Sequence, residues 1–327
     1  MSAERVVAVV FLSVVLSVLA GCGPTTGGPT AQMKLNLSPQ GETTYKVVTE
    51  FGKDYSFIQP SINKTKGRHT STRVEVVFAQ EIEGIDQEGI ATAIITIKEI
   101  RFLFMDVEGQ KAFFDSTAES SKSDPVCAAI GQSYKIQITP DGQVKSIDAE
   151  SARGVIKEEG LPKKFVNRLF SNKEIIKRHQ VLALMDAGQT LYKKGDKWSV
   201  VAASPEGMLS AKSFEKVYTV TDIKMQDGEK IAIVDMSAAP SSKRAADMAE
   251  DDPKANFFAK MFEETSDYNG KMVLNLSTGE IDSYREFLKA EWLVIEPSAQ
   301  QKGDKGPDQL TMSLSDLYSI EKVSSGN

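Results

Sequence analysis

The sequence contains few of the side chains that most often build catalytic or metal centres. Its 327 residues include only two cysteines, Cys22 and Cys127, and two histidines, His69 and His179. Neither histidine has a partner at metal-ligand spacing, and the sequence has no glycine-rich phosphate loop, nucleophile elbow or zinc-protease helix. We therefore expect a protein that is not an enzyme and that uses no metal or other cofactor.

The sequence also lacks an apolar run of the about 20 residues that are needed to span a bilayer. Its longest run, Val6–Leu19, has 14 residues, a length typical of the core of a signal peptide. The next residues, LAGC at 19–22, resemble the bacterial lipobox. This resemblance implies that residues 1–21 are a lipoprotein signal peptide and that Cys22 is acylated and anchors the chain in a lipid bilayer. An ordinary signal peptide with an incidental cysteine is the alternative.

The residues after Cys22 indicate where the protein resides. Gly23 stands where an aspartate would resemble a signal for retention in the inner membrane. We therefore expect a lipoprotein of the bacterial cell envelope, anchored in the outer membrane and facing the periplasm. Residues 22–32 comprise the lipidated cysteine and a flexible tether, because GPTTGGPTAQ has two prolines and no apolar periodicity. The net charge of −6 argues against a nucleic-acid partner.

Alternation of apolar and polar residues with a period of two dominates the rest of the chain and predicts β-strands. The pattern is clear in RVEVVFAQ, SYKIQIT and KMVLNLS. In ITIKEIRFLF the apolar phase shifts between Ile97 and Ile100, as an extra residue in a β-bulge would cause. Tight hairpins are predicted at three turns between alternating runs, Asp141-Gly142, Asp227-Gly228 and Thr278-Gly279.

Helical patterns are fewer. An apolar stripe over residues 161–185 predicts one helix, and DPKANFFAKMFEE predicts another, with Asp252 as its N-cap. Asp124-Pro125 opens the short apolar segment VCAAIG in the same way. We therefore predict an α+β fold that is mostly antiparallel β, with one or more curved sheets packed against helices.

Four landmarks recur in the same order along the chain: a strand that follows a glycine, a hairpin, an Asp-Pro helix start and a second hairpin. They divide the chain into a first β-rich half at 33–188, with a helical segment at about 149–186, and a second β-rich half at 189–327. A duplication would explain the order. No run of identical residues supports it, however, and any long antiparallel protein produces similar hairpins, so both interpretations stay open.

Three short stretches carry a resemblance to a known family. They are LNLSPQGETTYKVV, ITPDGQVKSI and GDKWSVV, and they resemble an uncharacterised family of bacterial envelope lipoproteins, classed as a domain of unknown function. The resemblance covers most of residues 35–325. It implies no catalytic residues, because these stretches mark strands and turns rather than a site.

The best candidate for a binding site is the apolar face of the segment around residues 95–104. Ile95, Ile97, Phe102 and Phe104 line a cavity for a hydrophobic ligand if the sheet curves around a void, and fill the core if it does not. Curved sheets that cradle a helix resemble periplasmic lipoprotein carriers, an analogy of fold that has little functional weight. The sequence thus favours a membrane-anchored, non-enzymatic envelope lipoprotein that binds a hydrophobic ligand or a lipidated partner. The alternative is a structural or protein-interaction component of the envelope.

Overall fold

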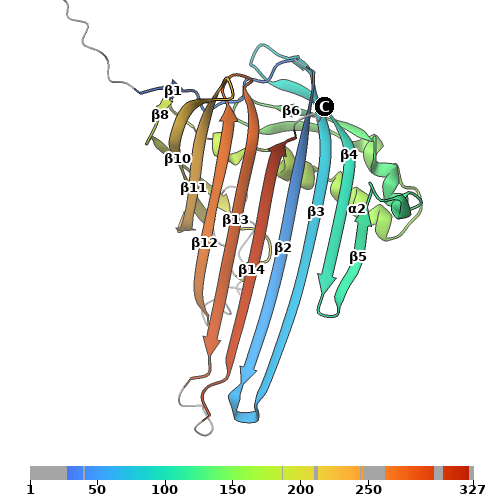
Figure 1. Cartoon of the computed structure of the whole chain (residues 1–327), viewed down its shortest axis with the longest axis vertical. Coiled ribbons are helices and arrows are strands. Elements are labelled where there is room, and N and C mark those ends of the chain that lie inside the picture. Colours follow the sequence, from blue (N-terminus) through green and yellow to red (C-terminus); the bar gives the residue numbers. More distant parts are fainter. Residues whose placement is uncertain are drawn as a thin grey trace, which may run out of the picture.

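A computed structural model describes residues 28–39, 41–185, 187–209, 213–243, 245, 262–297 and 305–323. Most of these residues belong to one large antiparallel sheet (Figure 1). Its strands are β2 (Glu42–Gln59), β3 (Lys64–Ile85), β4 (Ala91–Asp106), β5 (Gly109–Asp115), β6 (Ser133–Ile138), β7 (Val144–Asp148), β9 (Lys197–Ala203), β10 (Ser213–Gln226), β11 (Glu229–Ser241), β12 (Glu263–Asn275), β13 (Glu280–Ile295) and β14 (Gln309–Lys322). Two short strands, β1 (Thr30–Ala31) and β8 (Tyr192–Lys193), pair separately.

The chain passes through the large sheet as two meanders that meet in the middle. The spatial order is β7-β6-β4-β3-β2-β14-β13-β12-β11-β10-β9, and β5 pairs with the part of β4 beyond β6. The first strand of this sheet, β2, therefore lies beside the last strand, β14, although they stand at opposite ends of the chain (Figure 1). Strands from both sequence halves thus form one continuous sheet.

The predicted α+β class is wrong. Of the described residues, 58% lie in strands and 13% in helical segments, so the fold is nearly all antiparallel β. The helices are short: α1 (Glu150–Arg153), α2 (Leu161–Leu169) and α3 (Asn172–His179), with 3-10 turns η1 (Pro60–Ile62), η2 (Glu119–Ser121), η3 (Pro125–Ala129) and η4 (Leu182–Leu184). The helix predicted over 161–185 is divided because Ser171 caps a new helix, its hydroxyl accepting a hydrogen bond from the Glu174 N–H. Among the described residues, α-helices are thus confined to the segment 150–179, and alternation with a period of two governs most of the rest.

Asp124 caps η3, as predicted, because its Oδ1 accepts a hydrogen bond from the Val126 N–H at 2.8 Å. The other predicted Asp-Pro helix, capped by Asp252, falls on residues outside the described part of the chain. Its last two predicted residues, Glu263 and Glu264, instead begin β12.

The predicted hairpins and the predicted bulge are confirmed. The three turns join β6 to β7, β10 to β11 and β12 to β13. At one of them both Asp227 and Gly228 have positive φ, 52° and 85°, as a type I′ turn requires. The register between β3 and β4 shifts by one residue at Lys98. Ile97 and Ile100 therefore both face the core with no exposed surface.

One face of the sheet, here called the inner face, curls around the helical region between β7 and β9. Three hydrogen bonds tie this region to the sheet: Tyr134 of β6 to His179, Tyr318 of β14 to the Arg178 carbonyl, and Trp198 of β9 to the Ala183 carbonyl. These strands lie near one edge, at the centre and at the other edge, so the sheet must curve to reach the same short segment. The helices occupy the upper part of this face, and β2, β3, β13 and β14 extend well beyond them (Figure 1). None of the helices in the described part of the chain is long and apolar enough to cross a bilayer.

Candidate functional site

Ile95 and Ile97, two of the predicted cavity residues, lie in the closed part of the core. Ile95 pairs with Tyr134 of β6 and Ile97 with Phe78 of β3, and neither isoleucine has any exposed surface. Close packing of this kind leaves no room beside them for a bound molecule.

Phe102 and Phe104 lie further along β4, where the inner face is more open. Phe102 is half-buried and its ring centroid lies 5.2 Å from that of Phe165 in α2. Phe104 is also half-buried, and its neighbours across the sheet are Thr72 and Ala112. The structure thus divides the four predicted residues between a sealed pair and a partly accessible pair. Cys22, the predicted lipidation site, lies outside the described residues.

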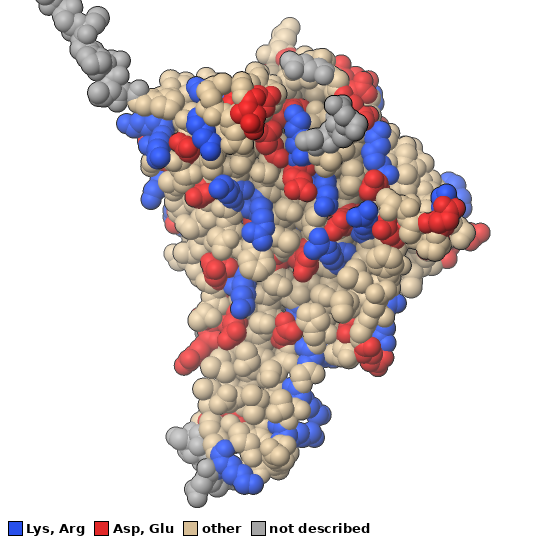
Figure 2. Space-filling view, viewed as in Figure 1, with Lys and Arg blue, Asp and Glu red and all other residues tan. Residues whose placement is uncertain are grey.

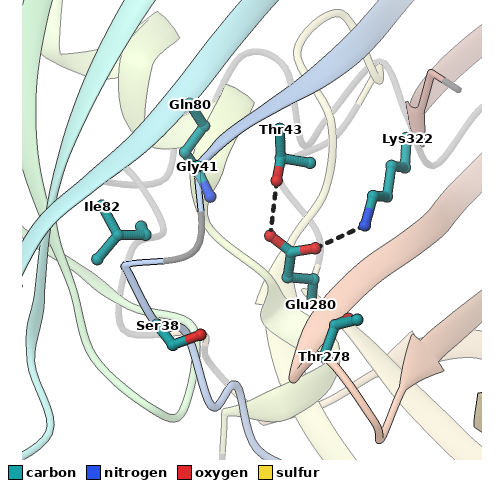
Figure 3. Close-up of a pocket in the computed structure, with 8 residues that line it drawn as sticks. All are labelled: Ser38, Gly41, Thr43, Gln80, Ile82, Thr278, Glu280 and Lys322. Carbon is teal, nitrogen blue, oxygen red and sulfur yellow. Dashed lines mark hydrogen bonds and ion pairs between the residues drawn. The ribbon is translucent and has the colours of Figure 1, made fainter. Parts of the chain in front are cut away.

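A polar cavity of about 120 Å³ lies at the upper ends of the central strands (Figure 3). It is lined by Ser38, Gly41, Thr43, Gln80, Ile82, Thr278, Glu280 and Lys322. Glu280 accepts hydrogen bonds from the Thr43 hydroxyl at 2.9 Å and from the Lys322 ammonium at 2.7 Å, so its carboxylate is already compensated (Figure 3). The cavity has room for a few water molecules and is too small and polar for a lipid chain.

A buried cluster joins the helical region to the sheet and contains Arg178 and His179 of α3 and Tyr134 of β6. The Tyr134 hydroxyl lies 2.7 Å from His179 Nε2 and accepts a hydrogen bond from Arg178 at 2.8 Å, and Arg178 also donates to the Leu169 carbonyl. Burial, and then the nearby Arg178 charge, lower the pKa of His179 well below its ordinary value, so this imidazole is neutral. The carbonyl at the end of α2 carries partial negative charge that favours the guanidinium. The cluster holds α3 against β6.

A second buried cluster, on the inner face of the other half of the sheet, centres on the ion pair between Lys216 of β10 and Glu286 of β13. Lys216 Nζ and Glu286 Oε2 are 2.7 Å apart, and both side chains are almost fully buried. The hydroxyls of Tyr268 and Tyr284 also donate to this carboxylate, and the Tyr218 hydroxyl lies 3.3 Å from that of Tyr284. Lys216 Nζ stands 4.8 Å from the centroid of the Tyr268 ring.

The charges of this second cluster are balanced within it. Burial by itself raises the pKa of Glu286, but the Lys216 ammonium and the hydrogen bonds from Lys216, Tyr284 and Tyr268 outweigh it, so the net pKa is lowered. Burial, and then the Glu286 charge, raise the pKa of both tyrosines well above the usual value, so they stay protonated. The ionised carboxylate thus has three donors and needs no further ligand.

This cluster is not among the sites predicted from the sequence, although the sequence contains a signal for it. Lys216 stands between Phe214 and Tyr218 in the apolar phase of its strand, and Glu286 stands between Tyr284 and Leu288 in the same way. A charged residue in an inward-facing position indicates a buried partner. The two residues are 70 positions apart, so the sequence alone does not pair them. Among the described residues, no group of three or more His, Cys, Asp or Glu side chains could hold a metal ion.

No protein-family model and no curated protein matches the chain. Among solved structures it is similar to OpdQ of Pseudomonas aeruginosa, at 10% identity and a TM-score of 0.19, over 85% of this chain and 97% of that one. A BenF-like porin from Pseudomonas fluorescens Pf-5 gives 7% identity and a TM-score of 0.20, over 88% and 100%. TM-scores this low do not show a common fold, so the similarity gives no information about function.

Proposed function

We propose that this chain is a non-enzymatic lipoprotein of the bacterial cell envelope, attached to a membrane through an acylated Cys22, that binds an acyl chain on the lower inner face of its sheet. The acyl chain belongs to a hydrophobic ligand or to a lipidated partner. The observation that carries the proposal is a set of apolar side chains on this face beyond the helices.

These side chains form two apolar rows across β2, β14 and β13. The first row is Tyr55, Met312 and Trp292, and the second is Phe57, Leu310 and Val294. Trp292 is buried, Tyr55 is 39% exposed, and the other four are half-buried. Side chains directly opposite each other on neighbouring strands touch, so the rows form one continuous apolar surface. A contiguous surface of this kind is typical of a binding site.

The buried polar clusters support a role without catalysis. Both Glu286 and Tyr134 have their hydrogen bonds satisfied inside the protein, and neither faces the polar cavity beside Glu280. They fasten strands and helices to each other. A hydrophobic ligand would meet the apolar rows rather than a reactive group.

The test uses the chain without residues 1–22, whose removal eliminates none of the described contacts, since these begin at Thr30. A fluorescent fatty acid should bind saturably to this protein. Met312→Ser and Leu310→Ser should each weaken binding about tenfold, because each removes apolar surface from a row. The control is Phe113→Ser, which changes a 58% exposed side chain of β5 and should leave binding unchanged.

The alternative role, a structural or interaction component of the envelope, is favoured by the sealed environment of Ile95 and Ile97. If the purified protein carries no lipid and does not bind the fluorescent fatty acid saturably, the proposal of acyl-chain binding is wrong and the structural or interaction role is the remaining one. The same outcome would be accompanied by a large loss of stability in Phe102→Ala, about 3 to 5 kcal/mol, because that ring would then serve only to fill the core against Phe165.

A further inference from the structure

The turn between β2 and β3 stands at the lower end of the molecule and has an unusual composition. The hairpin tip, residues 55–68, contains three charged side chains, Lys64, Lys66 and Arg68, and all three are basic and exposed. The chain as a whole has a net charge of −6. Figure 2 shows this basic group at the lower end, apart from the mixed charges of the main body. The tip is therefore locally cationic on an acidic protein.

The same tip presents two aliphatic side chains to solvent. Ile62 is 62% exposed and Ile58 is 39% exposed. Ile62 lies in the 3-10 turn η1, which begins with Pro60 and is closed by a hydrogen bond from the Asn63 N–H to the Pro60 carbonyl at 3.2 Å. Proline fixes its own backbone angle, so this turn holds the isoleucine outward in a defined position.

The basic and apolar groups are interleaved across the hairpin. Lys66 lies opposite Phe57 and Arg68 lies opposite Tyr55, on the same face of the two strands. The stems of long basic side chains pack along apolar neighbours while their charged ends point to an aqueous or headgroup layer. This is the arrangement that an anionic membrane surface requires: apolar groups for the acyl boundary and cations for the phosphates.

Two acidic side chains next to the tip, Asp54 and Asp308, are engaged by other partners. Asp54 hydrogen-bonds His69 at 2.7 Å, and Asp308 accepts a hydrogen bond from Gln59 at 2.9 Å. Neither carboxylate has an ion pair to Lys64, Lys66 or Arg68 among the interactions of the described residues. The three cations thus remain available to an external anion.

Protection of a strand edge would explain only part of this pattern. β4 pairs with β3 up to Ser71, so the segment from Lys64 to Thr70 has no strand on that side in the described part of the chain. Lysines at such an edge prevent pairing with another molecule. Protection of an edge does not call for an exposed Ile62, which would favour association rather than prevent it.

We propose that the hairpin tip docks on the surface of a bilayer that contains anionic phospholipid, with Ile58 and Ile62 entering the headgroup boundary and the three cations contacting phosphates. The tip and the start of the described chain lie at opposite ends of the molecule (Figure 1). Between them runs β3, whose 22 residues span about 70 Å. The tip is therefore a second membrane contact, at the opposite end of the molecule from the acyl chains proposed at Cys22. It borders the apolar rows, because Tyr55 and Phe57 belong to both.

The experiment uses the chain without residues 1–22, so that an acyl anchor cannot contribute, and measures sedimentation with vesicles. Vesicles of phosphatidylcholine mixed with phosphatidylglycerol should bind the protein at low salt, and pure phosphatidylcholine should bind it far less. Exchange of Lys64, Lys66 and Arg68 for glutamine should weaken binding about 100-fold, since each cation near such a surface contributes about one factor of five. Ile62→Ser should weaken it about tenfold.

The matched control exchanges three exposed lysines at the other end of the molecule, Lys193, Lys194 and Lys224, for glutamine and should bind as the unchanged protein does. All variants alter exposed side chains, so thermal unfolding followed by circular dichroism should confirm that each is folded. Absence of binding to the anionic vesicles, unchanged binding after the tip cations are exchanged, or a loss in the control variant would overturn the proposal. Unchanged binding of Ile62→Ser would also overturn it, because the contact would then be electrostatic adsorption alone.

Discussion

Removal of the buried ammonium in Lys216→Met tests whether the cluster around Glu286 stabilises the sheet. Lys216 on β10 and Glu286 on β13 are nearly inaccessible to solvent, and their 2.7 Å contact links strands that are not neighbours. Methionine has a similar volume to the lysine stem but no charge. The substitution therefore leaves a buried carboxylate with two tyrosine donors and no cation. Removing one partner of a buried pair costs about 3 to 5 kcal/mol.

The stability lost in Lys216→Met should depend on pH in a defined direction. In the unchanged protein the pKa of Glu286 is lowered, so its contribution is present above the unfolded pKa and is lost as pH falls through the folded pKa. Without Lys216, burial dominates and should raise the pKa of Glu286 above its unfolded value of about 4.3. Stability of the variant should then fall as pH rises through that range, since ionising the carboxyl becomes costly. The stability deficit of the variant relative to the unchanged protein should therefore be smallest at about pH 4, close to the unfolded pKa of the carboxyl. It should be largest at about pH 7, well above that pKa.

Urea unfolding measured at several pH values by the fluorescence of Trp198 and Trp292, which are both buried, would give this deficit. Lys224→Met is the control, because Lys224 lies exposed on the same strand and should change stability by less than about 0.5 kcal/mol. Addition of Glu286→Leu to Lys216→Met should restore part of the loss, because the unpaired charge is removed. A deficit below about 1 kcal/mol, or one that does not vary with pH, would show that the Lys216 ammonium does not compensate the buried Glu286 carboxylate.

Three further outcomes are expected. Mass spectrometry of the mature protein should find an acylated N-terminus at Cys22, and an unmodified N-terminus elsewhere would contradict the anchor. Asp124→Ala should lower the free energy of unfolding by about 1 kcal/mol, because the Val126 N–H loses its acceptor, and urea unfolding should detect this. Gly279→Ala should be far more destabilising than Gly228→Ala in the same measurement. Both glycines have positive φ, but a Cβ at Gly279 would clash with the Asn36 carbonyl oxygen, whereas Gly228 has open space around it. Equal losses at the two glycines would contradict the close approach.

The features that depend on neighbouring residues were predictable from the sequence. The turn at Asp227-Gly228, the bulge at Lys98 and the Asp124 cap each follow from a few consecutive side chains whose backbone preferences act locally. The fold class was wrong because an apolar stripe at helical spacing predicts a helix but not its length. Ser171 divides that stripe into short segments, and the strands around it hold most of the core.

The candidate sites could not be predicted, because they depend on which strands become neighbours. Phe57, Leu310 and Val294 form a row only after β14, at the end of the chain, pairs with β2 near its beginning, and Phe57 is 253 positions from Leu310. Each of these residues alone is an ordinary apolar position in an alternating strand. The β2–β3 tip differs, since its two exposed isoleucines and its three cations lie within fourteen consecutive residues, from 55 to 68. The composition of the tip is visible in the local sequence. The structure is needed to show that Ile62 is exposed and is therefore part of a surface rather than of a buried strand. The central pairing of β2 with β14 therefore both completes the core and aligns the apolar rows, which is why a change that weakens this pairing should affect stability and ligand binding together.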